Sequence, residues 1–346
     1  FELFNTTAFS RGRYTLQFLW NDGSGTELTP DTAPLSKETV TLPMGSAVNG
    51  TLLLTVKTID TKTGRCVAEE QPIVTLAVPA APAVKALPVG AGVQDGRFAL
   101  QRDGKLLLTA DTEGTLLYRA STDNDTDVYF RRPLTPWQNQ RTEIVSCKGI
   151  ANGYEVVTRL TNGKGRYTVT DTYQGTDKGV LVTSVLHRER GSRTVPRFGK
   201  VFRLDEIFDT VTYFARSGES YCDMKDQFCV QQVTCPVSTM TEPNIRPQES
   251  GNRMDCTTAA LTDGQLKVTF EAVGKPFELA VKPYTDRALT GMKHREDEVR
   301  TGTYVTVQAF QQGIGTGSCG PAIMPEFRYE LKQDCTLQFL IRVEEV

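Results

Sequence analysis

Short segments in which apolar and polar residues alternate recur along the chain, and they are rich in β-branched and aromatic residues. Alternation with a period of two directs one set of side chains into a core and the other set into water. The clearest of these segments are residues 51–59, 154–160, 167–173, 266–270, 277–281, 304–310 and 336–343. The pattern predicts an all-β protein built from packed antiparallel sheets.

Turn-forming residues separate the predicted strands. The sequence TNGKG at residues 161–165 joins two alternating segments, which predicts a β-hairpin over residues 154–173. Few windows keep a helical period, and the best of them is residues 285–292. Thr285 can cap this helix, and Leu289 and Met292 share one of its faces. Helix is therefore expected to contribute little to the fold.

Composition divides the chain into three parts. Residues 81–93 are rich in Ala, Pro and Gly and show no periodicity, which predicts an extended linker between domains. Residues 1–80 contain short strands with regular turns and have the size of an immunoglobulin-like β-sandwich. Residues 94–346 continue as strands and turns, and we expect one large β-sandwich there in preference to two small ones.

The charges are nearly balanced, with 39 Lys and Arg against 41 Asp and Glu. A dedicated nucleic-acid-binding protein usually carries a basic excess on one face, so we expect no nucleic-acid partner. The longest weakly polar stretch, residues 75–93, is interrupted by Lys85 and by three prolines, so we expect no membrane anchor. The chain begins with Phe1, without an initiator Met or a signal peptide, and we expect that a preceding segment has been removed.

Chemistry-bearing motifs are scarce. Eight cysteines are spread over the chain without a CxxC pair, and only His187 and His294 could add imidazole, so we predict neither a metal site nor a cofactor. Free thiols in a reducing compartment are the favoured interpretation, with a secreted protein that has a few disulfides as the alternative. Carboxylate pairs such as Asp123 and Asp125 do not identify a glycosidase dyad by spacing alone. The residues by themselves leave the function open.

Five stretches, in a consistent order, resemble glycoside hydrolase family 2 β-galactosidases. The first, FLWNDG at residues 18–23, is similar to the penultimate domain of that family. We name the other four motif A (residues 118–125, YRASTDND), motif B (213–225, YFARSGESYCDMK), motif C (246–255, RPQESGNRMD) and motif D (312–330, QGIGTGSCGPAIMPEFRYE). They resemble the family's WRAPTDND, YxGRGPxExYxDR, PQENGNRxD and closing GIG–CGP–PExxY motifs. Motif B departs most, because it lacks the Gly-Pro pair and the Arg after its Asp.

The resemblance implies a specific architecture. Family 2 β-galactosidases carry two sandwich domains, a (β/α)₈ barrel with both catalytic glutamates, a small sandwich and a large mutarotase-like sandwich. This sequence is similar to the last two, which implies an immunoglobulin-like β-sandwich followed by a mutarotase-like supersandwich. Because strands and helices do not alternate as a barrel requires, no catalytic residue is expected in this chain. The resemblance implies a C-terminal fragment of a retaining β-galactosidase, in preference to the small subunit of a two-chain enzyme.

Within motif A, a structural role is expected for Arg119, Asp123, Asn124 and Asp125. Short polar side chains bond to their own backbone, so the last three predict a fixed turn. Arg119 is expected to pair with one of the motif's carboxylates or with Glu249, in a partly buried bidentate contact. A direct role of these residues at a sugar site is the alternative.

Candidates for the rim of a sugar site come from motifs C and D. In motif C, Glu249, Asn252 and Arg253 combine a carboxylate, an amide and a guanidinium that can bond sugar hydroxyls, and a buried loop-fixing network is the competing interpretation. Gly251 between them suits a position with positive φ. In motif D, the resemblance implies that Cys319 replaces a Trp presented to the bound sugar, and packing beneath the loop is the alternative.

The resemblance also implies partners. They are a β-galactoside or galactose in the full-length enzyme and the missing N-terminal and barrel domains, and the full-length enzyme could form a homo-oligomer. A cytoplasmic or a periplasmic bacterial location suits such a family. A stand-alone carbohydrate-binding or mutarotase-like module is the alternative function. The order and the coverage of the matched stretches favour the non-catalytic β-galactosidase fragment.

Overall fold

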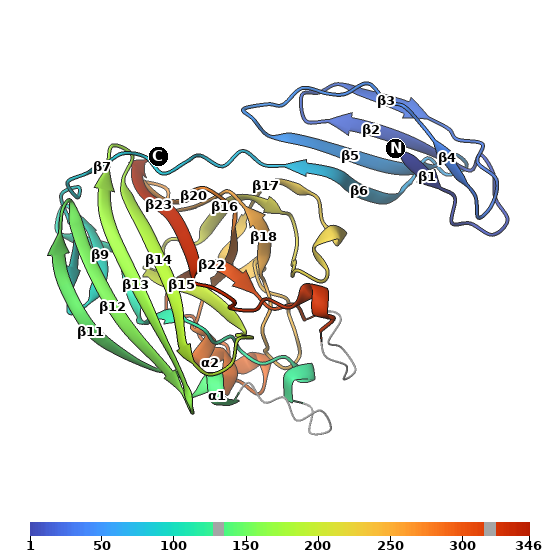
Figure 1. The fold of residues 1–346 in the computed structure, drawn as a ribbon. Helices are drawn as coiled ribbons and strands as arrows, with labels where there is room; N and C mark the ends of the chain where they lie inside the picture. The colour runs from blue at the N-terminus through green and yellow to red at the C-terminus, as the bar shows by residue number, and fades with distance from the viewer. Residues whose placement is uncertain (127–134, 315–322) are drawn as a thin grey trace. The chain divides into compact units, whose positions relative to one another are not determined.

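The computed structural model describes residues 1–126, 135–314 and 323–346, and it confirms the predicted all-β class. The chain divides into two compact units (Figure 1). Unit 1 comprises Phe1–Ala77 and Asp226–Val230, and unit 2 comprises Val78–Lys225 and Gln231–Val346. In the part of the chain that the structure describes, no helix is long and apolar enough to cross a membrane.

Unit 1 contains two antiparallel sheets. The larger has the order β3 (Gly25–Leu28), β2 (Tyr14–Trp20), β5 (Leu52–Asp60) and β6 (Cys66–Thr75), and the smaller pairs β1 (Glu2–Phe4) with β4 (Lys37–Thr39). Phe18, Trp20 and Leu54 form the buried centre of its core, and Leu3 of β1 packs against them. The indole nitrogen of Trp20 donates to the Pro43 carbonyl at 3.1 Å, which satisfies its polar group inside an apolar core.

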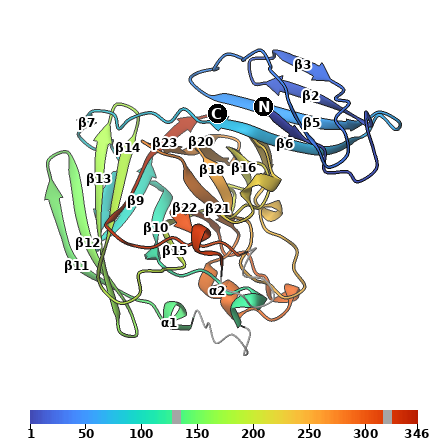
Figure 2. The same cartoon turned by 45° about the vertical axis from the view of Figure 1, so that its right-hand side comes forward.

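Unit 2 consists of two large antiparallel sheets. The seven-stranded sheet has the order β18 (Arg253–Cys256), β21 (Phe277–Lys282), β22 (Thr303–Gln311), β15 (Arg197–Leu204), β10 (Lys105–Leu116), β9 (Arg97–Arg102) and β8 (Ala91–Gln94). The ten-stranded sheet has the order β11 (Arg141–Ile150), β12 (Gly153–Asn162), β13 (Gly165–Thr176), β14 (Val180–Arg190), β23 (Cys335–Glu345), β20 (Leu266–Ala272), β19 (Thr258–Thr262), β16 (Thr210–Arg216) and β17 (Val230–Pro236), with β7 (Val84–Lys85) beside β13. Figure 2 shows both sheets from a second direction.

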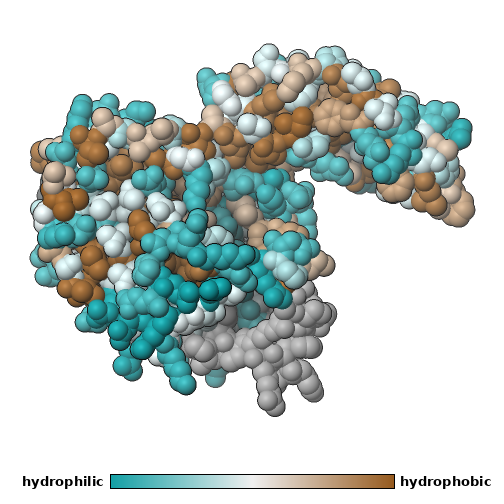
Figure 3. All heavy atoms as spheres, in the orientation of Figure 1, coloured by the Kyte–Doolittle hydropathy of each residue, from teal (hydrophilic) through white to brown (hydrophobic). Residues whose placement is uncertain are grey.

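One continuous hydrophobic core lies between the two sheets of unit 2. Its centre is aromatic: the ring of Phe202 on β15 lies 5.6 Å from that of Phe270 on β20 and 5.8 Å from that of Phe339 on β23. All three side chains are fully buried. Outside the core, hydrophilic and hydrophobic residues are interspersed over the face of the unit that Figure 3 shows. The two sheets are therefore held together mainly by apolar burial.

The predicted hairpin and the predicted helix are both confirmed. Strands β12 and β13 pair from Gly153–Gln174 to Asn162–Gly165, and Gly163 in the connection has a φ of 54°. Helix α2 spans Asp286–Gly291, and the Thr285 hydroxyl caps it by accepting from the Ala288 N–H at 3.1 Å. The remaining helices are single turns: η1 (Asp123–Thr126), α1 (Thr135–Gln138), η2 (Lys225–Gln227), η3 (Val237–Thr239), η4 (Arg295–Asp297) and η5 (Pro325–Phe327).

Residues 81–93, which the sequence predicts to be an extended linker between domains, contribute strands to unit 2. Strand β7 pairs with the end of β13, and β8 forms the edge of the seven-stranded sheet by pairing with β9. Backbone hydrogen bonds of an edge strand do not require an apolar side-chain pattern, so alternation could not reveal them. The seven cysteines in the described residues are free thiols, and the described residues contain no metal-binding group of His, Cys, Asp or Glu.

Candidate functional site

Motifs A, B, C and D, which are far apart in the sequence, are hydrogen-bonded to one another in unit 2. The bonds that join them include Asp123 N to Gln248 Oε1 at 2.9 Å, Ser220 N to Asn252 O at 2.9 Å, and Ile314 N to Asp223 Oδ1 at 3.2 Å. Motif C contacts both motif A and motif B, and motif B contacts motif D. The stretches that carry the resemblance therefore form one physical cluster.

Motif A folds around a bidentate ion pair. Arg119 donates through Nη1 to Asp125 Oδ2 at 2.7 Å and through Nη2 to Asp125 Oδ1 at 3.1 Å. Asp125 also accepts from the backbone N–H and the hydroxyl of Thr122, which closes the turn. Burial alone would raise the pKa of Asp125, but Arg119 and these donors outweigh it and lower the pKa below its usual value. Arg119 is thus locked by a partner in its own motif.

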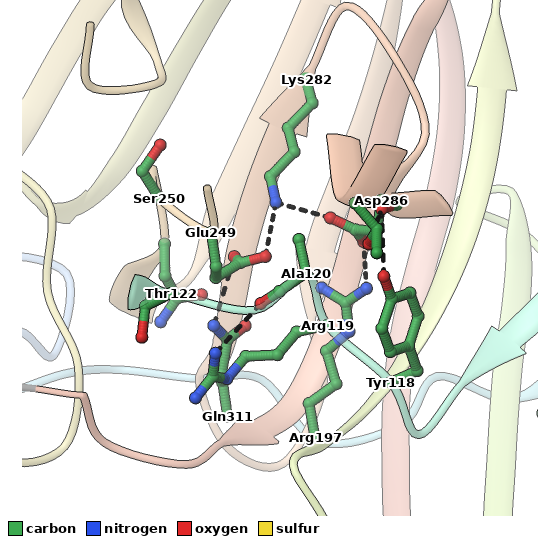
Figure 4. Close-up of polar contacts among 12 residues, drawn as sticks. Tyr118, Arg119, Ala120, Thr122, Arg197, Glu249, Ser250, Lys282, Asp286 and Gln311 are labelled. Carbon is green, nitrogen blue, oxygen red and sulfur yellow. Dashed lines mark hydrogen bonds and ion pairs between the residues drawn. The ribbon is translucent and has the colours of Figure 1, made fainter. Parts of the chain in front are cut away.

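A chain of buried charges runs beneath motif A (Figure 4). Lys282, the last residue of β21, donates to Glu249 Oε2 at 2.8 Å and to Asp286 Oδ1 at 2.7 Å. Asp286 in turn accepts from Nη2 of Arg197, and Gln311 donates to the second oxygen of Glu249 at 3.3 Å. Each of these charged side chains is at most 5% exposed. Two buried cations, Arg197 and Lys282, therefore balance two buried carboxylates, Glu249 and Asp286, while buried Arg119 pairs with Asp125, whose side chain is 19% exposed.

The protonation states of this chain of charges are fixed by their neighbours. Burial would raise the pKa of Asp286, but the Arg197 and Lys282 cations outweigh it and lower that pKa well below its usual value. Burial would lower the pKa of Lys282, and the Asp286 and Glu249 carboxylates outweigh it and raise that pKa. Both groups therefore stay charged near neutral pH, which suits an ion network and does not suit proton transfer.

A second buried network centres on Asn252. Its amide nitrogen donates to Glu278 Oε2 at 2.6 Å and to the Ser220 carbonyl at 2.8 Å, while its oxygen accepts from Gln308 at 2.8 Å. Burial raises the pKa of Glu278 to about 7, although the hydrogen bonds from Asn252 and from the Gln311 backbone act in the opposite direction. Asn252 has no exposed surface, so this network lies wholly inside unit 2.

Arg253 holds motif C against motif B. Its Nε donates to the Tyr213 hydroxyl at 3.1 Å, and Nη1 and Nη2 donate to the carbonyls of Asn252 and Met240. The guanidinium also lies 5.9 Å from the centre of the Tyr213 ring. Each of the three guanidinium nitrogens of Arg253 therefore bonds to a neighbouring protein atom.

The raised pKa of Glu278 predicts that the stability of the protein depends on pH. Its carboxyl has a pKa of about 7 when folded against an ordinary value of 4.5, so the folded state keeps a proton that the unfolded chain loses. The contribution of Glu278 to the free energy of unfolding should therefore fall by up to about 3 kcal/mol as pH rises from 4.5 to 7. Above that range, Glu278 should cause no further loss of stability. Urea denaturation of the wild-type protein and of Glu278→Gln, repeated across this pH range, checks the difference.

The matched control for this prediction is Glu143→Gln, whose side chain is 66% exposed. The stability difference between wild type and Glu278→Gln should change with pH, whereas the difference for Glu143→Gln should stay within a few tenths of a kcal/mol. A Glu278→Gln difference that is flat from pH 4.5 to 8 would contradict the buried, protonated state of Glu278.

The structure places most of the candidate residues in the interior. Glu249, Asn252 and Arg253 are between 0% and 5% exposed and bond to protein groups, whereas the Asp123 side chain is 63% exposed. The side chain of Asn124 and the whole of Cys319 lie outside the described residues. Glu249, Asn252 and Arg253 lie close together because they are neighbours in motif C. The motif gave no indication of the residues to which they bond.

Four residues of the site were missed by sequence reasoning: Arg197, Glu278, Lys282 and Asp286. One signal was present, because Glu278 and Lys282 lie in the apolar run FELAVK, whose six residues are all buried. Charged residues in a strand that is covered on both faces need buried partners. The partner of Lys282 in motif C is 33 residues away, and nothing local indicates it.

A comparison with protein families decides the identity of the chain. The family model described as β-galactosidase small chain matches residues 93–341. The chain belongs to this β-galactosidase small-chain family. The match covers most of unit 2 with all four motifs, and it confirms the resemblance that motifs A, B, C and D indicate.

Curated relatives of this small-chain protein are β-galactosidases. It is 28% identical over 221 residues to the β-galactosidase of Staphylococcus xylosus, in an alignment that covers 61% of this chain and 22% of that protein. It is 31% identical over 134 residues to the β-galactosidase of Lactococcus lactis, covering 38% of this chain and 13% of that protein. The chain thus spans less than a quarter of the length of these relatives.

Solved structures align with this chain only at low sequence identity and low TM-score. A galactose mutarotase-like protein from Lactobacillus casei aligns with 73% of this chain and 99% of its own, at 10% identity and a TM-score of 0.36. An overlap of this size identifies no function.

Proposed function

We propose that this chain is the non-catalytic C-terminal part of a β-galactosidase and that it braces the catalytic part of that enzyme. The observation that carries the proposal is the cluster formed by motifs A, B, C and D, through which the chain resembles the family. Inside unit 2, Arg119 bonds Asp125, Glu249 bonds Lys282, and Arg253 bonds the Tyr213 hydroxyl. A buried, balanced network of this kind holds loops in place.

The protonation states support a non-catalytic role. Retaining glycoside hydrolysis needs two carboxyl groups beside the sugar, one acting as a nucleophile and one as an acid. Glu249 and Asp286 bind Lys282 in the interior and have no surface to offer to a sugar. Glu278 has a pKa near neutrality, but it is 6% exposed and is held by Asn252 and the Gln311 backbone. These three carboxyl groups are thus closed to substrate.

The proposal gives different roles to the candidate residues. Glu249, Asn252 and Arg253 hold motif C against its neighbours, and Arg119 with Asp125 holds motif A. The surface above them exposes Ile245, at 91%, and the ion pair between Arg246 and Asp123. We assign this surface to contact with the catalytic part, and Cys319 of motif D remains the candidate for a place at the rim of the sugar site.

The isolated chain should show no hydrolysis of a nitrophenyl β-galactoside. The physical reason is that the carboxyl groups of the described site, Glu249, Glu278 and Asp286, are buried and bonded to protein groups, whereas retention requires two carboxyl groups beside the sugar. Release of nitrophenol is measured with protein purified from a host that lacks β-galactosidase, against a heat-inactivated sample. Turnover above that control would overturn the non-catalytic assignment.

A further inference from the structure

A cavity of about 120 Å³ lies between the two sheets of unit 2, apart from motifs A, B, C and D. It forms where β10 departs from regular pairing: Ala110 is opposite Phe202 and Thr115 is opposite Lys200, so β10 carries extra residues between these pairs. A bulge of this kind moves backbone out of the sheet and opens the space beneath it. The described residues around the cavity are Gly96, Arg97, Ala110, Gly114, Thr115, Thr142, Ile144, Thr158, Asp171, Tyr173 and Lys200.

A buried ion pair forms one wall of this cavity. The ammonium of Lys200 donates to Asp171 Oδ2 at 2.7 Å and to the Thr115 hydroxyl at 2.6 Å. The second carboxylate oxygen of Asp171 accepts from the Ser184 hydroxyl at 2.5 Å. Lys200 and Asp171 are each 2% exposed. Because an ammonium has three donors, Lys200 keeps one N–H for a further acceptor.

Two hydroxyl groups at the cavity have no hydrogen-bond partner in the part of the chain that the structure describes. They belong to Tyr173, which is 2% exposed, and to Thr158, which is 7% exposed. Tyr173 is held in place by its ring, which stacks on Phe98 with centroids 4.6 Å apart. Burial and the nearby Asp171 keep the pKa of Tyr173 well above its usual value, so its hydroxyl remains a donor. Hydroxyl groups that line a cavity without a protein partner take their hydrogen bonds from whatever occupies the cavity.

Among the side chains that the structure describes, the chemistry around the cavity favours a neutral ligand with several hydroxyl groups. An anion would meet the Asp171 carboxylate, and a cation would meet Lys200 and Arg97. A vicinal diol both donates and accepts, which matches a carboxylate, an ammonium and two hydroxyls placed together. Ile144 and Ala110 supply an apolar side for C–H groups. The volume equals that of roughly four waters in the liquid, which suits a three- or four-carbon polyol.

We propose that this cavity is a binding site for a small neutral polyol. The inference does not depend on the proposed role in a β-galactosidase, because no residue of motifs A, B, C and D takes part in it. The Tyr173 and Thr158 hydroxyls bind the ligand directly, and Lys200 supplies the additional donor. Ordered water alone is the competing occupant, and it is an outcome that the experiment distinguishes.

The experiment titrates the full chain with glycerol and with erythritol, and follows binding by saturation-transfer NMR and by chemical-shift changes. Tyr173→Phe removes one unpartnered hydroxyl while keeping the ring that stacks on Phe98, and Thr158→Val removes the other without changing the side-chain shape. Thr172→Val is the matched control, because it removes a hydroxyl from the opposite face of β13, next to Tyr173. Circular dichroism establishes that each variant is folded.

We expect saturable binding of a polyol by the wild-type protein and by Thr172→Val, with affinity at least five-fold lower in both cavity variants. No saturable binding to the wild-type protein would leave water as the occupant and overturn the proposal. Equal affinity of the wild-type protein and both cavity variants would overturn it as well. Inorganic phosphate is titrated in parallel, and tight binding of phosphate without binding of either polyol would show that the site takes an anion instead.

Discussion

Lys282→Ala should lower the free energy of unfolding by about 3–5 kcal/mol, the range observed when one partner of a buried ion pair is removed. Lys282 bridges Glu249 and Asp286, which are 2% and 5% exposed. Without its ammonium, Glu249 keeps the amide of Gln311 as a donor, and Asp286 keeps Arg197. The interior then carries one carboxylate more than it has cations to balance, and water cannot compensate for it.

A surface lysine provides the matched control for this prediction. Lys267 forms an ion pair with Glu344 at 2.9 Å, and the two side chains are 40% and 39% exposed. Exposed pairs of this kind contribute at most about 1 kcal/mol, so Lys267→Ala should have a small effect. Urea denaturation followed by circular dichroism measures both variants. Equal losses for Lys282→Ala and Lys267→Ala would contradict the assignment of the buried network as a structural element.

Gly251→Ala should also destabilise the protein strongly, because two effects coincide at this position. Gly251 has a φ of 86°, a conformation that costs other residues about 1–2 kcal/mol. A Cβ atom there would in addition lie 2.5 Å from the Met240 carbonyl oxygen, which no side-chain rotation can relieve. Because Met240 O also accepts from Arg253, its displacement would disturb motif C. We expect a total loss of about 3–5 kcal/mol.

Gly264 separates these two effects. Its φ is 88°, nearly the same as that of Gly251, but a Cβ atom there would meet nothing within 4 Å. Gly264→Ala should therefore cost only the conformational term of about 1–2 kcal/mol. Thermal and urea denaturation of the two variants compare the costs. If Gly251→Ala were no more destabilising than Gly264→Ala, the close approach of motif C to Met240 would be wrong.

The sequence could predict those parts of the fold that are local. Alternation over residues 154–160 and 167–173, with TNGKG between them, predicted two strands and their turn, because all of the signals lie within some 20 residues. The Thr285 cap is equally local, since the hydroxyl and the Ala288 N–H are three positions apart. Strand β7 and most of strand β8 lie in the predicted linker and were missed, because their pairing is made by backbone and leaves no side-chain pattern.

The site was predictable only in part. The resemblance pointed to Glu249, Asn252 and Arg253, and these lie together because they are neighbours in motif C. Their interior partners are brought in by the packing of strands distant in sequence: Glu278 is 26 residues from Asn252 along the chain. Arg197 and Asp286 are separated by 89 residues. Such pairs follow from the order of strands in the sheets, which residue patterns do not specify.

The central claim, that this chain is a bracing and non-catalytic part of a β-galactosidase, is tested most directly by restoring activity. The catalytic part of its own β-galactosidase is expressed as a separate polypeptide and mixed with the chain, and hydrolysis of a nitrophenyl β-galactoside is measured. We predict that neither piece is active alone, that the mixture is active, and that Lys282→Ala restores less activity than Lys267→Ala. Activity of the chain alone, or a mixture that stays inactive although both pieces are folded, would contradict the claim.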